Sequence, residues 1–532
     1  MNSGKNFYIS LVQLLGAFFF LSVVLNFDYP ADHWLSWKLV RPSIDCWMLF
    51  IVLAIAACRS KRFLFWTTLS IYALFLVLRM IRIGDTVVPM YLNRPLNLYI
   101  DSGYIFSLYD LLKTSTHQDD VFLISASALV IVLVYLALNW YAWRLAAGSL
   151  SARPVRITVL TLSGLVFSAA IIGGWRPAET PAIVRLYEEA LSARHQLNKQ
   201  QAVVARMEET AQERGVGPAS LDGLKGVNVL LIMVESYGHI VYSRPQYREA
   251  MTTTMAGFAK VLDQQGFKAV SSYLTSPTYG GISRLAHGTL EFGFRVKNNL
   301  DYTALLRSSL QPMASYFRKS GYRTVSVMPG TRFVYPEGTY YGYEQAYYAN
   351  HFNYKGPTFG WAPMPDQFVL DYVHRHEFNS HEQPHFIRYV LISTHAAYNI
   401  QPSFIDKWDT IGDGGIYNDQ PLVRYPIQWP NLQNAGSAYL RSLDYEFVTL
   451  GDYFAKYVKD DTLIIIMGDH QPNLHLTGDG QPWSVPVHII SRNPQLLSPF
   501  QKRGYTPGLI PAQPLPHDGM ETFLQDFLQD FR

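Results

Sequence analysis

Cysteine is nearly absent from this sequence: its 532 residues include two, Cys46 and Cys58. As a helix, the segment between them is too long for a disulfide to bridge its ends. The remainder of the chain contains no cysteine, so it has no disulfides and is expected to be stabilised by its own core. A large excess of charge of either sign is also lacking. The net charge is only +3, which argues against a nucleic-acid partner.

The sequence contains no internal repeat and no low-complexity tract, but its apolar residues crowd the first third. Five apolar segments are predicted to cross a membrane: residues 8–27, 46–58, 62–83, 121–140 and 157–175. Most approach the roughly 20 residues that a bilayer requires. Segment 46–58 is short, and this length is also typical of a buried or interfacial segment. The number of spans therefore depends on this segment.

The basic residues near these segments predict the orientation of the chain. They are Lys5, then Arg59, Lys61 and Arg62, and later Arg144, Arg153 and Arg156. Five spans place all three groups in the cytoplasm and send everything after residue 175 to the outer side. No small-residue cleavage site follows the first apolar segment, so we expect it to be retained as a span.

Beyond the membrane part the pattern changes twice. Residues 177–224 are rich in charge and helix formers and predict a juxtamembrane helix; a coiled-coil arm would need an apolar heptad that is not present. From residue 225 to 532, short β-rich runs alternate with helical stretches. Four runs, residues 227–234, 322–329, 387–394 and 462–468, are continuously apolar, as in strands buried on both faces of a parallel sheet. We therefore predict a multi-span α-helical membrane domain, residues 1–176, followed by an α/β domain with a mostly parallel central sheet.

Polar residues follow three of these predicted strands. They are Glu235 after the first, His395 after the third, and Asp469 with His470 after the fourth. Each alone has a structural explanation, since acidic residues at strand ends often cap the next helix and a lone histidine is more often structural. In parallel sheets, however, the ligand site lies outside the carboxyl ends of the strands. A set of Glu, Asp and His there suits a divalent cation, with Mn²⁺ or Zn²⁺ preferred and Mg²⁺ as an alternative.

A hydroxyl group completes this predicted site. In "SPTYGGISRLAHGTL", Gly280 and Gly281 precede Ser283 at what reads as a helix start, where backbone N–H groups can face a phosphate. The alternative is a surface turn with an N-cap serine. A metal nearby would lower the pKa of the Ser283 hydroxyl and make it a nucleophile, with Thr278 and Ser276 as competing hydroxyls.

The segments "NVLLIMVESYG", "GGISRLAHGTL", "STHAAYN" and "IMGDHQP" resemble, in this order, the alkaline phosphatase and sulfatase superfamily. Within it the chain is most similar to membrane-anchored lipoteichoic acid synthases and to phosphoethanolamine or phosphoglycerol transferases. The resemblance implies a sulfatase-like fold, a metal held by Glu235, Ser283, Asp469 and His470, and contact of His395 with the substrate's phosphate. Several relatives have threonine as the nucleophile. "SRLAH" lacks the formylglycine signature of true sulfatases, and the disulfides of transferases acting on lipid A are absent.

A later stretch, residues 329–368, is dense in aromatic residues and glycine. Most of its aromatic residues are expected to belong to the core, but three residues are predicted to bind substrate: Arg332, Trp361 and Asp366. Arginine can hold a phosphate with two hydrogen bonds, and aromatic faces can cover a glycerol chain or a sugar. Lipoteichoic acid synthases are similar in using an Arg and a Trp from the corresponding region.

These patterns predict a transferase in a bacterial inner membrane with its catalytic domain in the periplasm or outside the cell. A phospholipid would donate a phosphoglycerol or phosphoethanolamine headgroup through Ser283 to a glycan or lipid acceptor of the envelope. A membrane-anchored phosphodiesterase or sulfatase-like hydrolase would use the same ligands and pass the group to water. A binding module without activity would lack a ligand, and none is missing. The sequence leaves the headgroup, the acceptor, the metal and the oligomeric state open.

Overall fold

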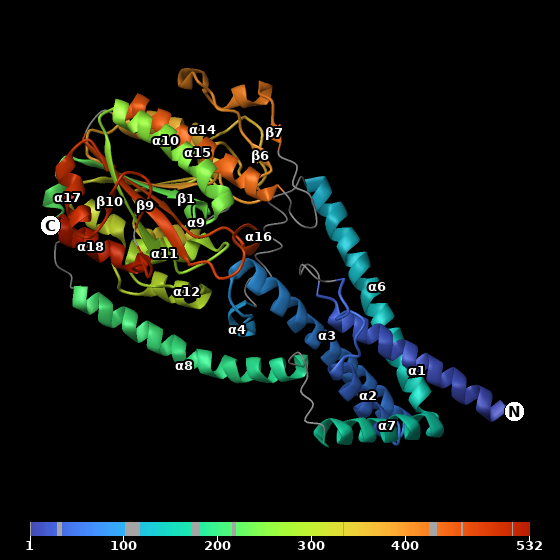
Figure 1. Cartoon of the computed structure of the whole chain (residues 1–532). Helices are drawn as coiled ribbons and strands as arrows, with labels where there is room; N and C mark the ends of the chain where they lie inside the picture. Colours follow the sequence, from blue (N-terminus) through green and yellow to red (C-terminus); the bar gives the residue numbers. More distant parts are fainter. Residues whose placement is uncertain are drawn as a thin grey trace. The chain divides into compact units, whose positions relative to one another are not determined.

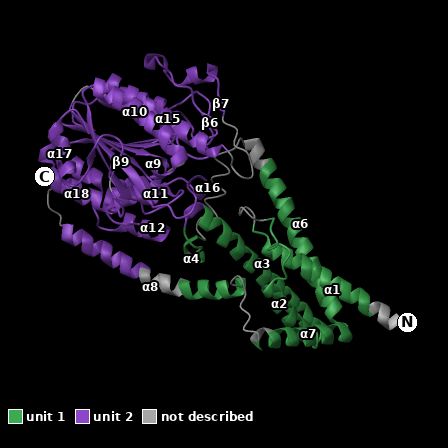
Figure 2. Cartoon of the chain, in the orientation of Figure 1, with its two compact units in different colours: residues 1–90, 94–197 green, residues 91–93, 198–532 purple. Residues whose placement is uncertain are grey.

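The structure is a computed structural model that describes residues 2–28, 35–101, 118–172, 181–214, 220–332, 335–424, 434–458, 461–512 and 514–532. These residues form two compact units, which are coloured separately in Figure 2. Unit 1 comprises residues 1–90 and 94–197, and unit 2 comprises residues 91–93 and 198–532.

Unit 1 is helical. Its helices are α1 (Asn2–Asn26), α2 (Ile44–Ala56), α3 (Lys61–Leu92), α4 (Leu98–Asp101), α6 (Gln118–Leu150), α7 (Arg153–Ile172) and the first half of α8 (Ala182–Arg214), as labelled in Figure 1. Helices α1 and α6 pack together, and α2 contacts α1, α6 and α7. Leu21, Leu53, Phe75 and Trp143 are fully buried where the helices meet. The interior of unit 1 is thus an apolar helical bundle.

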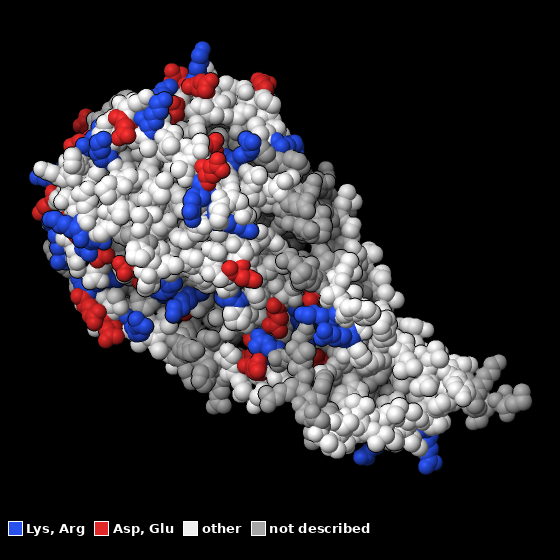
Figure 3. All heavy atoms as spheres, viewed as in Figure 1, with Lys and Arg blue, Asp and Glu red and all other residues white. Residues whose placement is uncertain are grey.

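Three described helices are long and apolar enough to cross a membrane: Phe7–Asn26, Lys61–Leu92 and Leu123–Leu150. Helix α2 is apolar but has only 13 residues. On α6, large apolar side chains such as Ile131, at 68% exposure, face outward rather than into the bundle. Figure 3 shows the surface of this part of unit 1 with few charged side chains. Such a surface is expected for helices in contact with lipid, and the predicted total of five spans stays a prediction.

Unit 2 contains an eight-stranded sheet in the order β10-β2-β9-β8-β1-β5-β3-β4. The strands are β1 (Asn228–Val234), β2 (Lys268–Thr275), β3 (Arg323–Met328), β4 (Gln345–Tyr348), β5 (His385–Leu391), β8 (Thr462–Gly468), β9 (Ser484–Ser491) and β10 (Thr506–Pro507). The block β8-β1-β5-β3-β4 is parallel, whereas β9, β2 and β10 pair antiparallel to their neighbours. The mostly parallel α/β architecture is confirmed.

The four predicted strands correspond to β1, β3, β5 and β8, which lie in one parallel block. In β1, Leu230, Ile232 and Val234 belong to one hydrophobic core and Val229, Leu231 and Met233 to the other. Because successive side chains of a strand point to opposite faces, a strand covered on both sides must be apolar throughout. This explains why these runs show no alternation.

Helices cover both faces of the sheet (Figure 1). On one face, α10 (Pro245–Gln264) and α15 (Ala435–Tyr457) pack against each other, and α14 (Asp366–Val373) joins the same core. On the other face lie α11 (Ser283–Phe292), α13 (Met313–Lys319), α17 (Pro494–Lys502) and α18 (Phe523–Asp530). The sheet is therefore the middle layer of three.

The register of the central strands aligns their carboxyl ends. Val234 of β1 pairs with Gly468 of β8 on one side and with Leu391 of β5 on the other. The residues that follow these three strands thus leave the sheet at one level. Glu235, Asp469 and the loop that begins at Ile392 meet at this edge, where ligand sites of such sheets lie.

Candidate active site

The ends of β1 and β8 bring two carboxylates and an imidazole together. One ligand atom each from Glu235, Asp469 and His470 lies within 4.8 Å of the others. Nε2 of His470 lies 3.2 Å from Oε1 of Glu235 and 3.5 Å from Oδ2 of Asp469. All three side chains are buried. This is the cluster of acidic and histidine ligands that the strand ends predict.

Ser283 is placed at this cluster by the start of α11. Its Oγ donates a hydrogen bond to Oε2 of Glu235 at 2.9 Å and lies 3.2 Å from Nε2 of His470. Gly280 and Gly281 have φ values of +69° and +152°, which glycine adopts without steric cost. Ile282, just before Ser283, has a φ of +62°, a strained conformation for a β-branched residue. The chain is thus turned sharply so that the helix opens with Ser283 at the carboxylate.

The two competing hydroxyls are engaged elsewhere. Oγ of Ser276 donates to the carbonyl of Asp469 at 2.7 Å, and Oγ1 of Thr278 donates to the carbonyl of Gly281, also at 2.7 Å. Both bonds stabilise the loop before α11. Of the three hydroxyls, the one bonded to the acidic cluster in the described structure is that of Ser283.

The cluster has the properties of a cation site. Oδ1 of Asp469 accepts the backbone N–H groups of Ser236 and His470, each at 2.8 Å, whereas Oδ2 is buried without a hydrogen-bond partner among the described residues. Burial and the charge of Glu235 raise the pKa of Asp469. The same carboxylates, against the effect of burial, raise the pKa of His470 to about 9. The cluster therefore favours a positive charge, which a proton on His470 or a bound cation can supply. Oxygen and nitrogen donors of this kind fit one divalent cation, which would also give Oδ2 a partner.

Three of the predicted substrate residues form a second group beside this cluster. The ring of Trp361 stacks on that of His395, with centroids 4.1 Å apart and an interplanar angle of 13°. Nη2 of Arg332 donates to the carbonyl of Trp361 at 2.7 Å. The residue before His395, Thr394, donates from Oγ1 to the carbonyl of Glu235 at 2.7 Å. The loop after β5 therefore connects the aromatic and basic group to the acidic cluster.

Asp366 lies apart from this group. It begins α14 and is fully buried, and its Oδ2 accepts the backbone N–H groups of Ile392 at 2.8 Å and Ser393 at 2.5 Å. In this position the carboxylate bonds to the loop that carries His395 and has no exposed surface for a substrate. Asp366 therefore lies behind the site, where it supports the loop, and does not line the site as predicted.

Sequence reasoning did not assign a role to two further residues. His287, one turn along α11 from Ser283, places Nε2 3.9 Å from Oδ2 of Asp469, and this nitrogen has no hydrogen-bond partner among the described residues. The spacing of four residues on one helix could have indicated it. Gln471 fills the space above Gly238, where a Cβ would lie 2.0 Å from Oε1 of Gln471. The "ESYG" and "GDHQP" segments thus fit together through this contact.

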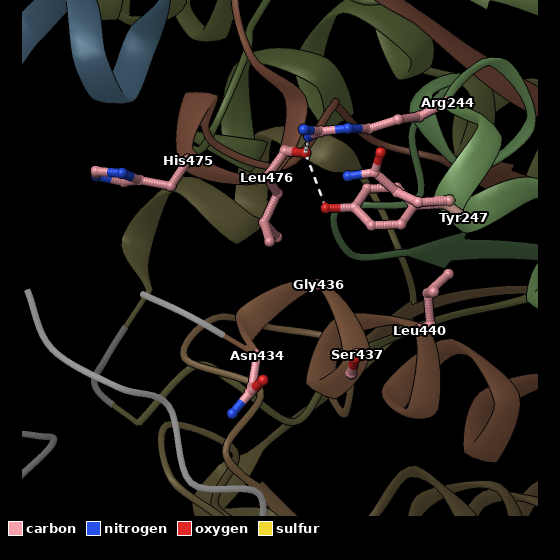
Figure 4. Close-up of a pocket in the computed structure, with 9 residues that line it drawn as sticks. Arg244, Tyr247, Asn434, Gly436, Ser437, Leu440, His475 and Leu476 are labelled. Carbon is pink, nitrogen blue, oxygen red and sulfur yellow. Dashed lines mark hydrogen bonds between the residues drawn. The ribbon is translucent and has the colours of Figure 1, made fainter. Parts of the chain in front are cut away.

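A separate cavity of about 330 Å³ is lined by residues from three parts of unit 2 (Figure 4). Its lining comes from the starts of α10 and α15 and from α16 (Leu474–Thr477): Arg244, Gln246, Tyr247, Asn434, Gly436, Ser437, Leu440, His475 and Leu476. Arg244 and the hydroxyl of Tyr247 both donate to the carbonyl of Leu476, the latter at 3.0 Å. None of the residues predicted for the site lines this cavity.

Comparison with known proteins identifies the family. The sulfatase family model matches residues 227–509, more than half of the chain, and this range contains every residue predicted for the site. Comparison with curated protein sequences gives no match.

Several solved structures are similar to this chain over part of its length. The lipoteichoic acid synthase LtaP from Listeria monocytogenes is 13% identical, with 60% of this chain and 78% of that chain covered and a TM-score of 0.39. The phosphoglycerol transferase GacH from Streptococcus pyogenes is 11% identical, with 62% and 92% covered and a TM-score of 0.35. The periplasmic domain of the phosphoethanolamine transferase EptC from Campylobacter jejuni is 11% identical, with 57% and 89% covered and a TM-score of 0.36. On the family match, the chain belongs to the sulfatase family, whose metal-dependent members are hydrolases or transferases.

Proposed function

We propose that the protein transfers a phosphoglycerol or phosphoethanolamine headgroup from a phospholipid to a glycan or lipid acceptor of the cell envelope. The observation that carries this proposal is the hydroxyl of Ser283, 2.9 Å from Glu235 within a buried cluster suited to a divalent cation. A serine in this environment is activated as a nucleophile toward phosphorus.

A phospholipid donor is favoured by the rest of the chain. Unit 1 contributes three helices that are long and apolar enough to cross a membrane, and α6 presents exposed apolar side chains. A hydrolase acting on soluble substrates has no need of several spans, whereas an enzyme whose substrate is a lipid needs its site near the bilayer. We therefore place the protein in a bacterial inner membrane with unit 2 on the outer side.

The first step forms a covalent intermediate. Oγ of Ser283 attacks the phosphorus of the donor, its proton passes toward Oε2 of Glu235, and the bond from phosphorus to the diacylglycerol oxygen breaks. Since Nδ1 of His395 is bonded to the carbonyl of Ala396 at 2.6 Å, the nitrogen left for a substrate is Nε2. A protonated His395 donates from Nε2 to a phosphate oxygen and can give the departing alkoxide its proton.

The second step releases the headgroup from the enzyme. A hydroxyl of the acceptor attacks phosphorus and gives its proton to Nε2 of His395, while the bond from phosphorus to Oγ of Ser283 breaks and the serine takes back the proton held at Glu235. Arg332 and Trp361, which are linked to His395, are proposed to hold the headgroup during both steps.

A divalent cation bound by Glu235, Asp469, His470 and Ser283 would lower the pKa of the serine hydroxyl and stabilise negative charge on phosphate. Mn²⁺ and Zn²⁺ suit these ligands best, and Mg²⁺ is also compatible. The alternative function is a membrane-anchored phosphodiesterase or sulfatase-like hydrolase, in which water takes the place of the acceptor hydroxyl.

The decisive experiment supplies the full-length protein in lipid vesicles with labelled phosphatidylglycerol and, separately, labelled phosphatidylethanolamine. Release of diacylglycerol from one of them identifies the donor. Label recovered on an envelope acceptor indicates transfer, whereas label recovered as free glycerol phosphate or phosphoethanolamine indicates hydrolysis. No diacylglycerol from either lipid, with the metal bound, would refute the proposed donor class.

A further inference from the structure

The loop after β5 is held from behind by a single carboxylate. Oδ2 of Asp366 accepts the N–H groups of Ile392 and Ser393, and the backbone N–H of Asp366 donates to Oγ of Ser393 at 3.1 Å. Three hydrogen bonds thus join the first residue of α14 to the start of the loop. Two residues later the same loop presents His395 to Trp361.

A second carboxyl group lies against Asp366. Glu446 lies on α15, which packs against α14, and both it and Asp366 are fully buried and close enough for their charges to act on each other. Oδ1 of Asp366 and both oxygens of Glu446 are buried without a hydrogen-bond donor among the described residues. None of the described Lys or Arg side chains forms an ion pair with either group. Two adjacent carboxylates cannot both be ionised in such a place.

We propose that Glu446 is a protonated carboxylic acid that donates a hydrogen bond to Oδ1 of Asp366, and that this pair positions the 392–395 loop for the reaction. Asp366 and Glu446 are positioning residues, because neither reaches the substrate. The proposal rests on the proposed function only for its kinetic consequence. The proton on Glu446 and the position of the 392–395 loop do not depend on that function.

The proton is assigned by the bonds around it. Oδ2 of Asp366 accepts two N–H groups, which favours the ionised form of this group, so Glu446 is the member that keeps its proton. Burial and the charge of Asp366 raise the pKa of Glu446 well above its usual value, in agreement with this assignment. The O–H of Glu446 then donates a hydrogen bond to Oδ1 of Asp366, the carboxylate oxygen that does not bond to the loop.

The loop transmits this arrangement to the active site at two points. Thr394 bonds to the carbonyl of Glu235, and His395 stacks on Trp361. If Asp366 loses its partner, it becomes a buried charge that is only partly compensated, and its hold on the loop weakens. We expect the position of His395, and with it the stacking on Trp361, to be disturbed first, because His395 follows Ser393 by two residues.

Two variants of Glu446 test the proposal in the full-length protein. Glu446→Gln keeps the shape and offers an amide N–H to Asp366, so it should behave as the wild type. Glu446→Leu removes the donor, and hydrogen–deuterium exchange of the peptide containing Ile392 and Ser393 should quicken about tenfold or more, as expected for a lost charge-assisted bond. The control is Asp371→Asn, which removes a second buried carboxylate of α14, the helix of Asp366; that carboxylate accepts hydrogen bonds from Arg375 and Tyr457 instead.

Infrared difference spectra between the wild type and Glu446→Gln at neutral pH examine the proton itself. Loss of a carbonyl band from a protonated carboxyl group is expected, and loss of a carboxylate band instead would overturn the assignment. A Gln variant whose loop exchanges as fast as in the Leu variant would overturn it as well. Loop exchange in the Leu variant that does not exceed that of Asp371→Asn would refute the positioning role.

Kinetics then connect the pair to the reaction. With the donor lipid, Glu446→Leu should raise KM about tenfold and change kcat less, while the Gln variant restores both values. Wild-type kinetics in the Leu variant, with its loop loosened, would overturn the kinetic part. Absence of lipid turnover in the wild type would refute the proposed function, but the exchange and infrared results would still decide the structural part.

Discussion

Ser283 is the residue on which the proposed chemistry depends most directly, because its Oγ alone would form the bond to phosphorus. Ser283→Ala should reduce turnover by at least about 10³-fold, as for the loss of other catalytic nucleophiles. Metal content and lipid binding should remain, since Glu235, Asp469 and His470 are unchanged. Assay of headgroup release, with elemental analysis of the same sample, checks this expectation.

The matched control is Thr253→Ala, which removes an exposed hydroxyl that bonds only within α10. Mass spectrometry of the wild type incubated with donor and no acceptor should find the added headgroup on the peptide that contains Ser283. An adduct on Ser276 or Thr278 would move the nucleophile, and full activity of the alanine variant would refute the mechanism.

The buried oxygen Oδ2 of Asp469, which lacks a partner among the described residues, leads to a prediction about metal content. Asp469→Asn and Glu235→Gln keep the shape of each side chain and remove its charge. Both should lose the bound metal, and activity should fall on the order of 10²-fold or more, while the fold survives. Elemental analysis of the purified full-length protein measures the first effect. Asp444→Asn, at an exposed position on α15, is the control. Unchanged metal content in both variants would exclude the site.

Most residues of the candidate site could be predicted because they stand at the ends of strands. The continuous apolar run before Glu235 and the run before Asp469 are unmistakable in the sequence, and parallel strands end at one edge. Asp366 shows the limit of this reasoning. Its neighbours in the sequence are aromatic and suggest a binding loop, but its contacts are with Ile392 and Ser393, which only the fold brings near.

At the level of elements, β2 and β9 were not among the predicted strands. β9 contains Pro486 and lies in the interior of the sheet, where proline normally argues against a strand. Pro486 is tolerated because the pairing of β9 with β8 ends at Val487. β2 contains Ser271 and Ser272, which interrupt the apolar pattern. The sequence pattern therefore missed β2 and β9 because each contains residues that are unusual in a buried strand, and only the neighbouring strands show how these residues fit.

The neighbour of Ser271 in β9 is the buried His488, and from its surroundings we predict that the stability of the protein depends on pH. Nδ1 of His488 in β9 lies 2.7 Å from Oγ of Ser271 in β2, which itself donates to the carbonyl of Gly508. Oγ of Ser271 therefore accepts from Nδ1–H, and Nε2 accepts from the hydroxyl of Tyr237 at 2.9 Å. Burial lowers the pKa of His488 to about 3. The folded protein holds this ring in its neutral form.

Below about pH 6.5 the unfolded chain takes up a proton at His488, whereas the folded protein does not until pH 3 is approached. The free energy of unfolding should therefore decrease as the pH falls through this range, by at most about 1.4 kcal/mol per pH unit for one such group. His488→Gln should be less stable at pH 7 but show a flatter dependence on pH, measured as the thermal midpoint from pH 7 to 4. The exposed His376, replaced by Gln, is the control. Equal slopes in all three proteins would contradict this account.

At the scale of the whole molecule, the proposed function requires unit 2 to face the outside of the membrane. Five spans and cytoplasmic basic loops predict this orientation. An alkaline phosphatase fused to the C-terminus should be active, because that enzyme matures only outside the cytoplasm, and a fusion at the basic loop of residues 59–62 should be inactive. Activity of the loop fusion alone would mean an even number of spans, with segment 46–58 as the first to be reconsidered.

The register between β1 and β8 limits where this chain can gain or lose residues. Seven residues lead from Asn228 to Val234 and seven from Thr462 to Gly468, paired one to one, and Glu235 and Asp469 follow at the same level. A single deletion within either strand would turn the following carboxylate to the opposite face of the sheet. The 227 positions between residues 234 and 462 are free of this constraint wherever the chain runs in loops. Homologous chains should therefore differ in length between the two strands while keeping the strands themselves fixed, so that variation in substrate can arise without disturbing the reacting atoms.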